Sequence, residues 1–287
     1  MLLIHSAPDP HARYSHYLAE ILRAEGFCDF AEADLAQCDA AQLAQHDLVI
    51  LPRCIPQRAQ TDLLVDYEVP ISIGLHFKNA GNASLRGVAI ESANPVGGTA
   101  ILIENSPKVS IQRCNISGFQ FGILVEKSPL ANIFQNKIAI STAWQTGEVP
   151  EAHGIVVING EGVIVDKNEV SGALFGIWAC DKNGTLRRNY THDNYLGIIL
   201  CKVPFGNFIL PGGSPTGAQF SCAKWTVRNN VSDHNLNVGY LVIDGANNNR
   251  VEQNEASENG AYDYELTGDS YRFGFLTPFC FNNTVKV

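Results

Sequence analysis

The chain has 287 residues, of which 45% are hydrophobic and 17% charged, and its formal net charge is −9. This composition excludes a disordered chain, and the acidic balance argues against general binding to nucleic acid or to an anionic membrane, since both need a basic face. It also disfavours a strongly polyanionic substrate unless a metal ion or a local basic patch compensates. No run of 18 or more apolar residues is present, which excludes a membrane span.

The N-terminal segment, residues 1–56, has its own pattern. It predicts alternating strands and helices, in the order 2–5, 14–25, 27–31, 40–45 and 48–51. This βαβαβ order resembles the opening of a flavodoxin-like or amidotransferase-like domain, but it is too short for a whole one and lacks a GxGxxG motif and a phosphate loop. We expect a small α/β cap over the open end of the repeats that follow, with a truncated nucleotide-binding unit as the alternative.

The remainder, residues 57–287, contains a sequence motif that recurs about every 22–24 residues where no insertion intervenes. Its two clearest copies are 111–125 and 164–178, and looser copies span 186–200, 226–242 and 251–266. Within each copy apolar residues alternate with others, which is the period of strands. Because one such unit cannot bury its own apolar side, the pattern predicts stacked coils, a parallel β-solenoid.

Asparagines recur at matching turn positions of these copies. They are Asn136, Asn168, Asn189, Asn230 and Asn254, with Cys114 in the equivalent place of the first copy. Asn tolerates a left-handed backbone, and its amide can bond an equivalent Asn one coil away. We therefore predict a ladder of stacked Asn side chains with a spacing of about 4.8 Å.

From about Asn79 onward these repeats resemble the right-handed parallel β-helices of the pectin-lyase-like superfamily. The resemblance implies an all-β fold with three strands per coil, the Gly-Ile-x-Val segment forming the first strand. In enzymes of that superfamily the outer face of this strand usually binds saccharides, and many members are secreted or periplasmic. The resemblance implies no activity, because the same scaffold also serves adhesion, chaperone and structural roles.

The start of the chain, Met1 to Pro8, lacks the basic residues and long apolar core of a secretory signal. We therefore expect either a cytoplasmic chain or a mature form with a replaced leader. The eight cysteines show no CxxC motif and no zinc spacing. Disulfides and stacked free thiols both remain open, the latter for Cys180 and Cys201, which share a strand position in neighbouring coils.

Two insertions, residues 141–153 and 202–222, flank the first-strand sheet and are placed to wall a groove over it. The candidate substrate-binding residues of this groove are Trp144, His153, Trp178, Lys202 and Asp244. Trp144 and Trp178 are the candidate stacking platforms for a sugar. The outward residues of the central coils are apolar, which departs from the carboxylate clusters of a calcium-dependent lyase or a hydrolase. The alternatives are that this apolar strip is covered or that it forms an oligomer interface.

The most specific candidate for a catalytic site is a pair of stacked turns. Counting from the ladder Asn, Thr191-His192-Asp193 overlies Ser232-Asp233-His234 one coil away. The candidate catalytic residues are therefore His192, Asp193, Asp233 and His234. A His beside an Asp can act as an oriented general base, and such pairs also suit a divalent metal ion. The alternative is that both turns are ordinary hydrogen-bonded loop caps.

Three hypotheses for function follow. The first is a saccharide-active protein, of lyase, epimerase or hydrolase type, that binds a polysaccharide or oligosaccharide along the first-strand groove. The second is a non-catalytic structural or interaction solenoid. The third is a metal-handling accessory protein, against which the single Met and the lack of paired cysteines weigh.

Overall fold

The computed structural model describes residues 2–5, 31–34, 49–50, 73–92, 97–147, 152–201, 222–243, 245–266, 271–272, 275–276, 280 and 282–286. Over these residues the chain is almost entirely β-strand, with one short 3-10 turn, η2 (Thr142–Trp144). No helix in this described part is long and apolar enough to cross a membrane.

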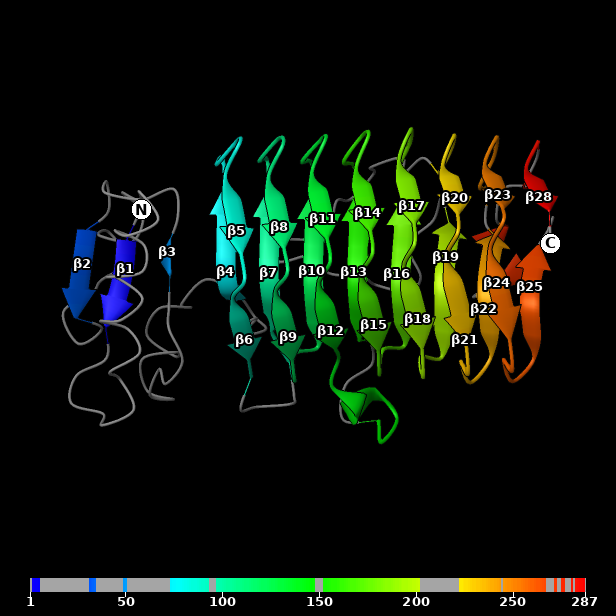
Figure 1. The fold of residues 1–287 in the computed structure, drawn as a ribbon, viewed down its shortest axis with the longest axis horizontal. Helices are drawn as coiled ribbons and strands as arrows, with labels where there is room; N and C mark the ends of the chain where they lie inside the picture. The colour runs from blue at the N-terminus through cyan, green and yellow to red at the C-terminus, as the bar shows by residue number, and fades with distance from the viewer. Residues whose placement is uncertain are drawn as a thin grey trace.

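Three parallel sheets, here called sheets A, B and C, form the walls of one continuous coil (Figure 1). Sheet A contains the long strands β4 (Ile73–Lys78), β7 (Thr99–Glu104), β10 (Phe121–Glu126), β13 (His153–Ile158), β16 (Phe175–Cys180), β19 (Leu196–Cys201), β22 (Val238–Ile243) and β25 (Tyr262–Leu266). Sheet B contains β5 (Ser84–Arg86), β8 (Ser110–Gln112), β11 (Asn132–Phe134), β14 (Ile164–Asp166), β17 (Thr185–Arg187), β20 (Thr226–Arg228), β23 (Arg250–Glu252) and β28 (Thr284–Lys286). Sheet C contains β6 (Ala89–Glu91), β9 (Asn115–Ser117), β12 (Lys137–Ala139), β15 (Glu169–Ser171), β18 (Tyr190–His192), β21 (Val231–Asp233) and β24 (Glu255–Ser257).

Each coil visits sheets A, B and C in that order, and every strand pairs in parallel with its counterpart one coil away. The predicted three-strand coil is thus confirmed, with the Gly-Ile-x-Val segment in sheet A. In sheets B and C the three-residue strands turn their middle side chain inward and the two flanking ones outward, as in β17 and β18.

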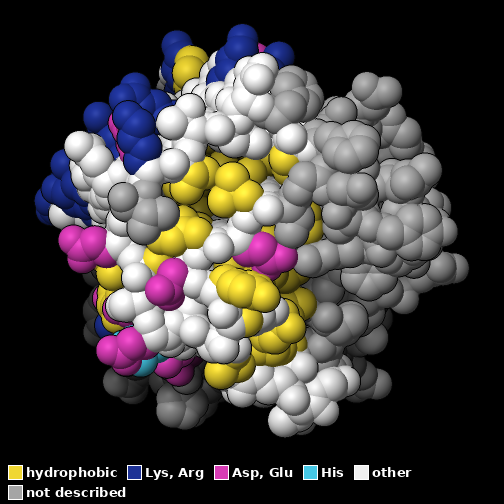
Figure 2. All heavy atoms as spheres, turned by 90° about the vertical axis from the view of Figure 1, so that its right-hand side faces the viewer, with side chains coloured by type: hydrophobic (Ala, Val, Ile, Leu, Met, Phe, Trp, Pro, Cys, Tyr) yellow, Lys and Arg dark blue, Asp and Glu magenta, His cyan; other side chains and the backbone are white. Residues whose placement is uncertain are grey.

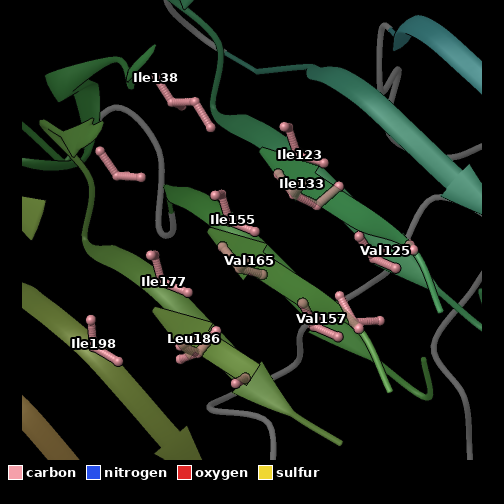
Figure 3. Close-up of a cluster of buried hydrophobic side chains, with 14 of the residues drawn as sticks. Ile123, Val125, Ile133, Ile138, Ile155, Val157, Val165, Ile177, Leu186 and Ile198 are labelled. Atoms are coloured by element: carbon pink, nitrogen blue, oxygen red, sulfur yellow. The ribbon is translucent and has the colours of Figure 1, made fainter. Parts of the chain in front are cut away.

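The interior of the coil is a single column of buried aliphatic side chains. Sheet A contributes alternate residues such as Ile155 and Ile177, and sheet B contributes the middle residue of each strand, such as Val165 and Leu186 (Figure 3). Each of these four side chains is 0% exposed. Stacking therefore buries what a single coil would leave open to water.

The predicted asparagine ladder is present where sheet B turns into sheet C. Asn136, Asn168, Asn189 and Asn230 each donate the side-chain amide to the Oδ1 of the next Asn at 2.9–3.0 Å, ending at Asn254. Cys114 takes the first position, where its backbone N–H donates to Asn136 Oδ1 at 2.9 Å. A second ladder, which we did not predict, runs through Asn194, Asn235 and Asn259 where sheet C turns into sheet A.

Glycine at the second position of the sheet A strands is required by a close approach. A Cβ on Gly176 would lie 2.6 Å from the carbonyl oxygen of Gly197 and 3.0 Å from Nδ2 of Asn194 in the second ladder. Both distances are shorter than ordinary van der Waals contact. The Gly of the repeated Gly-Ile-x-Val motif thus leaves room for the second asparagine ladder and for the backbone of the neighbouring coil.

At the N-terminus, β1 (Leu2–His5) pairs in parallel with β2 (Ala31–Asp34) and β3 (Val49–Ile50). The strand predicted at 2–5 is therefore confirmed, and the other two lie at 31–34 and 49–50. Ile50 of β3 pairs with Leu75 of β4, so sheet A continues into this segment. The predicted helices at 14–25 and 40–45 lie outside the described residues, and the division into a cap (1–56) and a β-helix (57–287) stays a prediction. At the other end, β26 (Tyr271–Arg272) and β27 (Phe275–Leu276) form a hairpin.

Candidate functional site

The two turns predicted to stack on each other do so at the end of sheet C. Thr191 pairs with Ser232 and His192 with Asp233 in the register of β18 and β21. Thr191 and Ser232 are the inward middle residues, both fully buried, and their hydroxyls hydrogen-bond at 2.9 Å. The backbone register of the two strands, to which this buried contact adds, places the outward side chains of His192 and Asp233 next to each other.

His192 is held on three sides. Its Nδ1 lies 2.6 Å from Asp193 Oδ2, and its ring stacks on Tyr190 with centroids 4.4 Å apart. Its Nε2 lies 3.6 Å from Glu169 Oε1 one coil away. Glu169 Oε1 in turn forms an ion pair with Lys137 Nζ at 2.7 Å. The hydrogen bond from Lys137 lowers the pKa of the Glu169 carboxyl. A carboxylate at Nδ1 fixes the orientation of the imidazole. The Nε2 of His192 is buried and has no hydrogen-bond partner among the described residues.

His234 has a carboxylate at each ring nitrogen. Its Nδ1 lies 3.2 Å from Asp233 Oδ1, and its Nε2 lies 2.7 Å from Glu258 Oε2. The hydrogen bond with Asp233 and the charge of Glu258 raise the pKa of His234 above its ordinary value. The protonated imidazolium is therefore favoured, and since 54% of the side chain is exposed, it can meet a ligand from solvent.

Two tyrosines border the patch, and neither was predicted. Tyr190 donates its hydroxyl to Asp233 Oδ1 at 3.0 Å and thereby joins the two coils. Tyr195 is 38% exposed just beyond Asn194. Tyr190 follows the ladder residue Asn189 directly, so listing the outward residues of sheet C, as was done for sheet A, would have found it. We call His192, Asp193, Asp233, His234, Glu169, Glu258 and Tyr190 the sheet C patch. Figure 2 shows acidic side chains with a His on the lower left of the molecule, on the side where Figure 1 draws sheet C.

Trp144 lies beside this patch rather than over the middle of sheet A. Its indole N–H donates to the carbonyl of Gly172 at 2.8 Å, and its ring meets Tyr195 edge-on with centroids 6.1 Å apart. The side chain is half-buried against the interior core. Trp144 and Tyr195 thus form an aromatic pair, in which Tyr195 lies three residues after His192.

Trp178 and His153 are placed differently from our prediction. Trp178 points outward from sheet A, as the alternation predicted, and His153 lies beside it on the same face; they are 0% and 1% exposed and pack with Phe121 and Phe175. Trp178 belongs to a second buried cluster, which lies on the outer face of sheet A and runs from Leu102 to Ile243. The expected open groove is therefore not present over these residues, because their side chains are enclosed, and the rings offer no free face to a sugar.

Of the other predicted residues, Lys202 and Asp244 lie outside the described part of the chain. Asp181, next to the end of β16, is 4% exposed, and its Oδ2 has no hydrogen-bond partner. Burial raises the pKa of this carboxyl to about 6. No group of three or more His, Cys, Asp or Glu side chains converges as metal ligands within the residues that the structure describes.

A family model for the right-handed β-helix region matches residues 73–210 and 151–275. No curated protein proved similar to the sequence. Among solved structures, the Dettilon tailspike protein (gp208) is similar, with 15% sequence identity and a TM-score of 0.49. The similarity covers 61% of this chain and 34% of the tailspike chain.

Proposed function

Because the chain belongs to the right-handed β-helix family, we propose that it is a carbohydrate-associated protein that binds a saccharide at the sheet C patch and acts on it by acid–base catalysis. The observation that carries this proposal is the register of β18 and β21, which places two His–carboxylate pairs in adjacent coils. A reaction at a glycosidic bond or at a sugar carbon requires one group to give a proton and another to take one.

The two histidines are suited to different halves of such a reaction. His234, flanked by Asp233 and Glu258, favours the protonated form and is the candidate acid. His192, oriented by Asp193 through Nδ1, is the candidate base. Its Nε2, the reacting atom of this proposal, is buried 3.6 Å from Glu169 Oε1, so the neighbouring side chains must move when a substrate binds. Tyr190 links the two pairs, because its hydroxyl donates to Asp233 and its ring stacks on His192.

Trp144 and Tyr195 supply the apolar part of the proposed site. Sugar rings present C–H faces that pack on aromatic rings, while their hydroxyls bond polar groups. Because the patch itself is rich in carboxylates, the proposed substrate at this place is a neutral saccharide rather than a polyanion. This location replaces the groove along the outer face of sheet A.

The test is turnover and binding on a panel of neutral glycans and uronic-acid polymers. His192→Ala and His234→Ala should each abolish turnover and leave the melting temperature within a few degrees of wild type, because partly exposed turn residues contribute little to stability. His76→Ala is the matched control, since His76 pairs with Glu104 on sheet A, away from the patch. A large loss of melting temperature in either patch variant, with turnover per folded molecule unchanged, would assign the histidines to structure.

A second candidate function is a non-catalytic solenoid. Its support is that the polar groups of the patch already bond one another, from Lys137 through Glu169 on one side to Glu258 on the other. In that case glycans bind or fail to bind identically in wild type and in both His variants, and no turnover occurs on any member of the panel.

A further inference from the structure

The outer face of sheet B carries a stripe of basic side chains along the axis of the coil. These side chains come from the outward strand positions and from the turn into sheet C. They are Arg86, Arg113, Lys167, Arg187, Arg188, Arg228, Arg250 and Lys286. The same positions hold two carboxylates, Asp166 and Glu252, which are 3% and 9% exposed. In a chain with a net charge of −9, this face is locally positive.

Two arginines of the stripe are held in place by a buried carboxylate. Arg187 donates through Nε to Asp166 Oδ2 at 3.1 Å. Arg188 binds both oxygens of the same carboxylate, through Nε at 2.9 Å and through Nη2 at 2.6 Å. The carboxylate of Asp166 orients the two guanidinium groups. It neutralises one of their two positive charges, so the group of three side chains keeps a net charge of about +1.

Arg228 extends this basic surface by one coil. It pairs with Arg187 in the register of β17 and β20 and forms no ion pair in the described part of the chain. Its neighbour in the next coil, Glu252, already accepts from Arg250 Nε at 2.8 Å. On the other side, Lys167 is exposed and lies over the ring of Phe134, 5.6 Å from its centroid. Among the residues that the structure describes, Lys167 and Arg228 are thus cations with no carboxylate partner, on either side of the Arg187–Arg188 pair.

We propose that this stripe binds an acidic polysaccharide, a polymer of carboxylate-bearing sugars, laid along sheet B. Successive coils are about 4.8 Å apart, a spacing comparable with the length of one sugar in an extended chain. Cations in consecutive coils therefore match carboxylates on consecutive sugars. Nucleic acid is the less suitable partner, since its dense phosphate charge is repelled more strongly by a protein of net charge −9. Figure 2 shows the Lys and Arg side chains gathered at the top of the molecule, away from the acidic group at the lower left.

The proposal is tested by binding of polygalacturonate to the full chain at several salt concentrations. The double variant Lys167→Gln/Arg228→Gln removes two cations and leaves the bonds of Asp166 intact. Lys78→Gln/Lys182→Gln is the matched control, because these lysines are 52% and 49% exposed outside the stripe and the change in net charge is the same. We expect wild type to bind with an affinity that falls as the salt concentration rises. The double variant should bind roughly 10-fold more weakly than wild type, because it lacks two charge-assisted bonds. The control should stay within about twofold of wild type.

Three results would overturn the proposal. Absence of binding by wild type at low salt shows that the stripe has no such ligand. Equal weakening in the double variant and in the control shows a general charge effect. Preference for a single-stranded DNA of equal charge over polygalacturonate shows that phosphate is the partner. Because the sheet C patch is intact in all these proteins, turnover on neutral glycans reports separately on the proposed function.

Discussion

Asn189 donates its side-chain amide to Asn230 Oδ1 at 2.9 Å, although 41 residues separate the two in sequence. Between them lies the insertion at 202–222, and the ladder continues past it with the same geometry as in the uninterrupted coils. The coil therefore keeps its register through local hydrogen bonding at the turn, independently of the length of the loop that follows sheet A.

Asn189→Ala tests this ladder. The side chain makes four buried hydrogen bonds, donating to Val165 O and Asn230 Oδ1 and accepting from the backbone and side-chain amides of Asn168. Its removal leaves buried donors and acceptors without partners, and we expect a loss of about 3 kcal/mol or more in the free energy of unfolding. Urea denaturation measures it, with the substitution of exposed Asn115 in β9, Asn115→Ala, as the control. A loss below about 1 kcal/mol would show that the ladder contributes little.

Gly176→Ala tests the close approach between neighbouring coils. The added Cβ would press on Gly197 O and Asn194 Nδ2, and overpacking of this kind costs about 1–3 kcal/mol. The matched substitution is Gly87→Ala, where a Cβ meets nothing within 4 Å and only the positive φ of 70° opposes it. Thermal unfolding should rank Gly176→Ala as the more destabilising, and the reverse order would mean that backbone conformation outweighs packing here.

Asp181 gives a pH dependence of stability whose sign follows from its raised pKa. Burial raises the pKa from 3.8 to about 6, so the folded state binds the proton more tightly than the unfolded state. This contribution to stability is complete below about pH 4 and is lost as the pH rises through 6, by about 3 kcal/mol at most. The charged groups that act on Asp181 are Glu161 and Lys182.

Asp181→Asn should remove this dependence. The variant keeps the shape of the side chain but not its charge, so its stability relative to wild type should rise between pH 4 and pH 7. Urea denaturation at both pH values measures the difference, with exposed Glu255→Gln as the control. Parallel pH curves for wild type and Asp181→Asn would contradict the raised pKa.

The pKa of His234 can be followed directly by NMR titration of its ring. Glu258→Gln should lower this pKa toward its ordinary value, because the carboxylate at Nε2 favours the imidazolium. Since the folded pKa lies above the unfolded one, the contribution of His234 to stability is present below about pH 6.5 and is lost as the pH rises through the folded pKa. Glu255→Gln, which removes a carboxylate of the adjoining strand β24 that forms no ion pair with His234 among the described residues, should leave the titration unchanged.

The coil and its registration were predictable because they depend on a local, repeated pattern. The positions of Asn136 to Asn254 gave the ladder, and counting from Asn189 and Asn230 gave the stacking of His192 on Asp233. The second ladder had the same kind of signal, an Asn five residues after the first, as in Asn194 and Asn235.

What covers each face was not predictable in this way. Trp178 follows the outward alternation of sheet A, but its burial depends on side chains from several coils. Likewise the approach of Glu169 to His192 follows from the side-chain conformations of two neighbouring coils, which the repeat pattern does not determine. Strand alternation gives the direction of a side chain and not its surroundings.

Ser171, His192, Asp233 and Ser257 stand at one register position in four successive coils. Because all four side chains point outward, exchanging them leaves the buried core of the coil unchanged. Equivalent positions in neighbouring coils lie about 4.8 Å apart along the axis. An acid or a base can therefore be moved along the axis by one coil at a time. The distance between two reacting groups is then set by the choice of the coils that bear them.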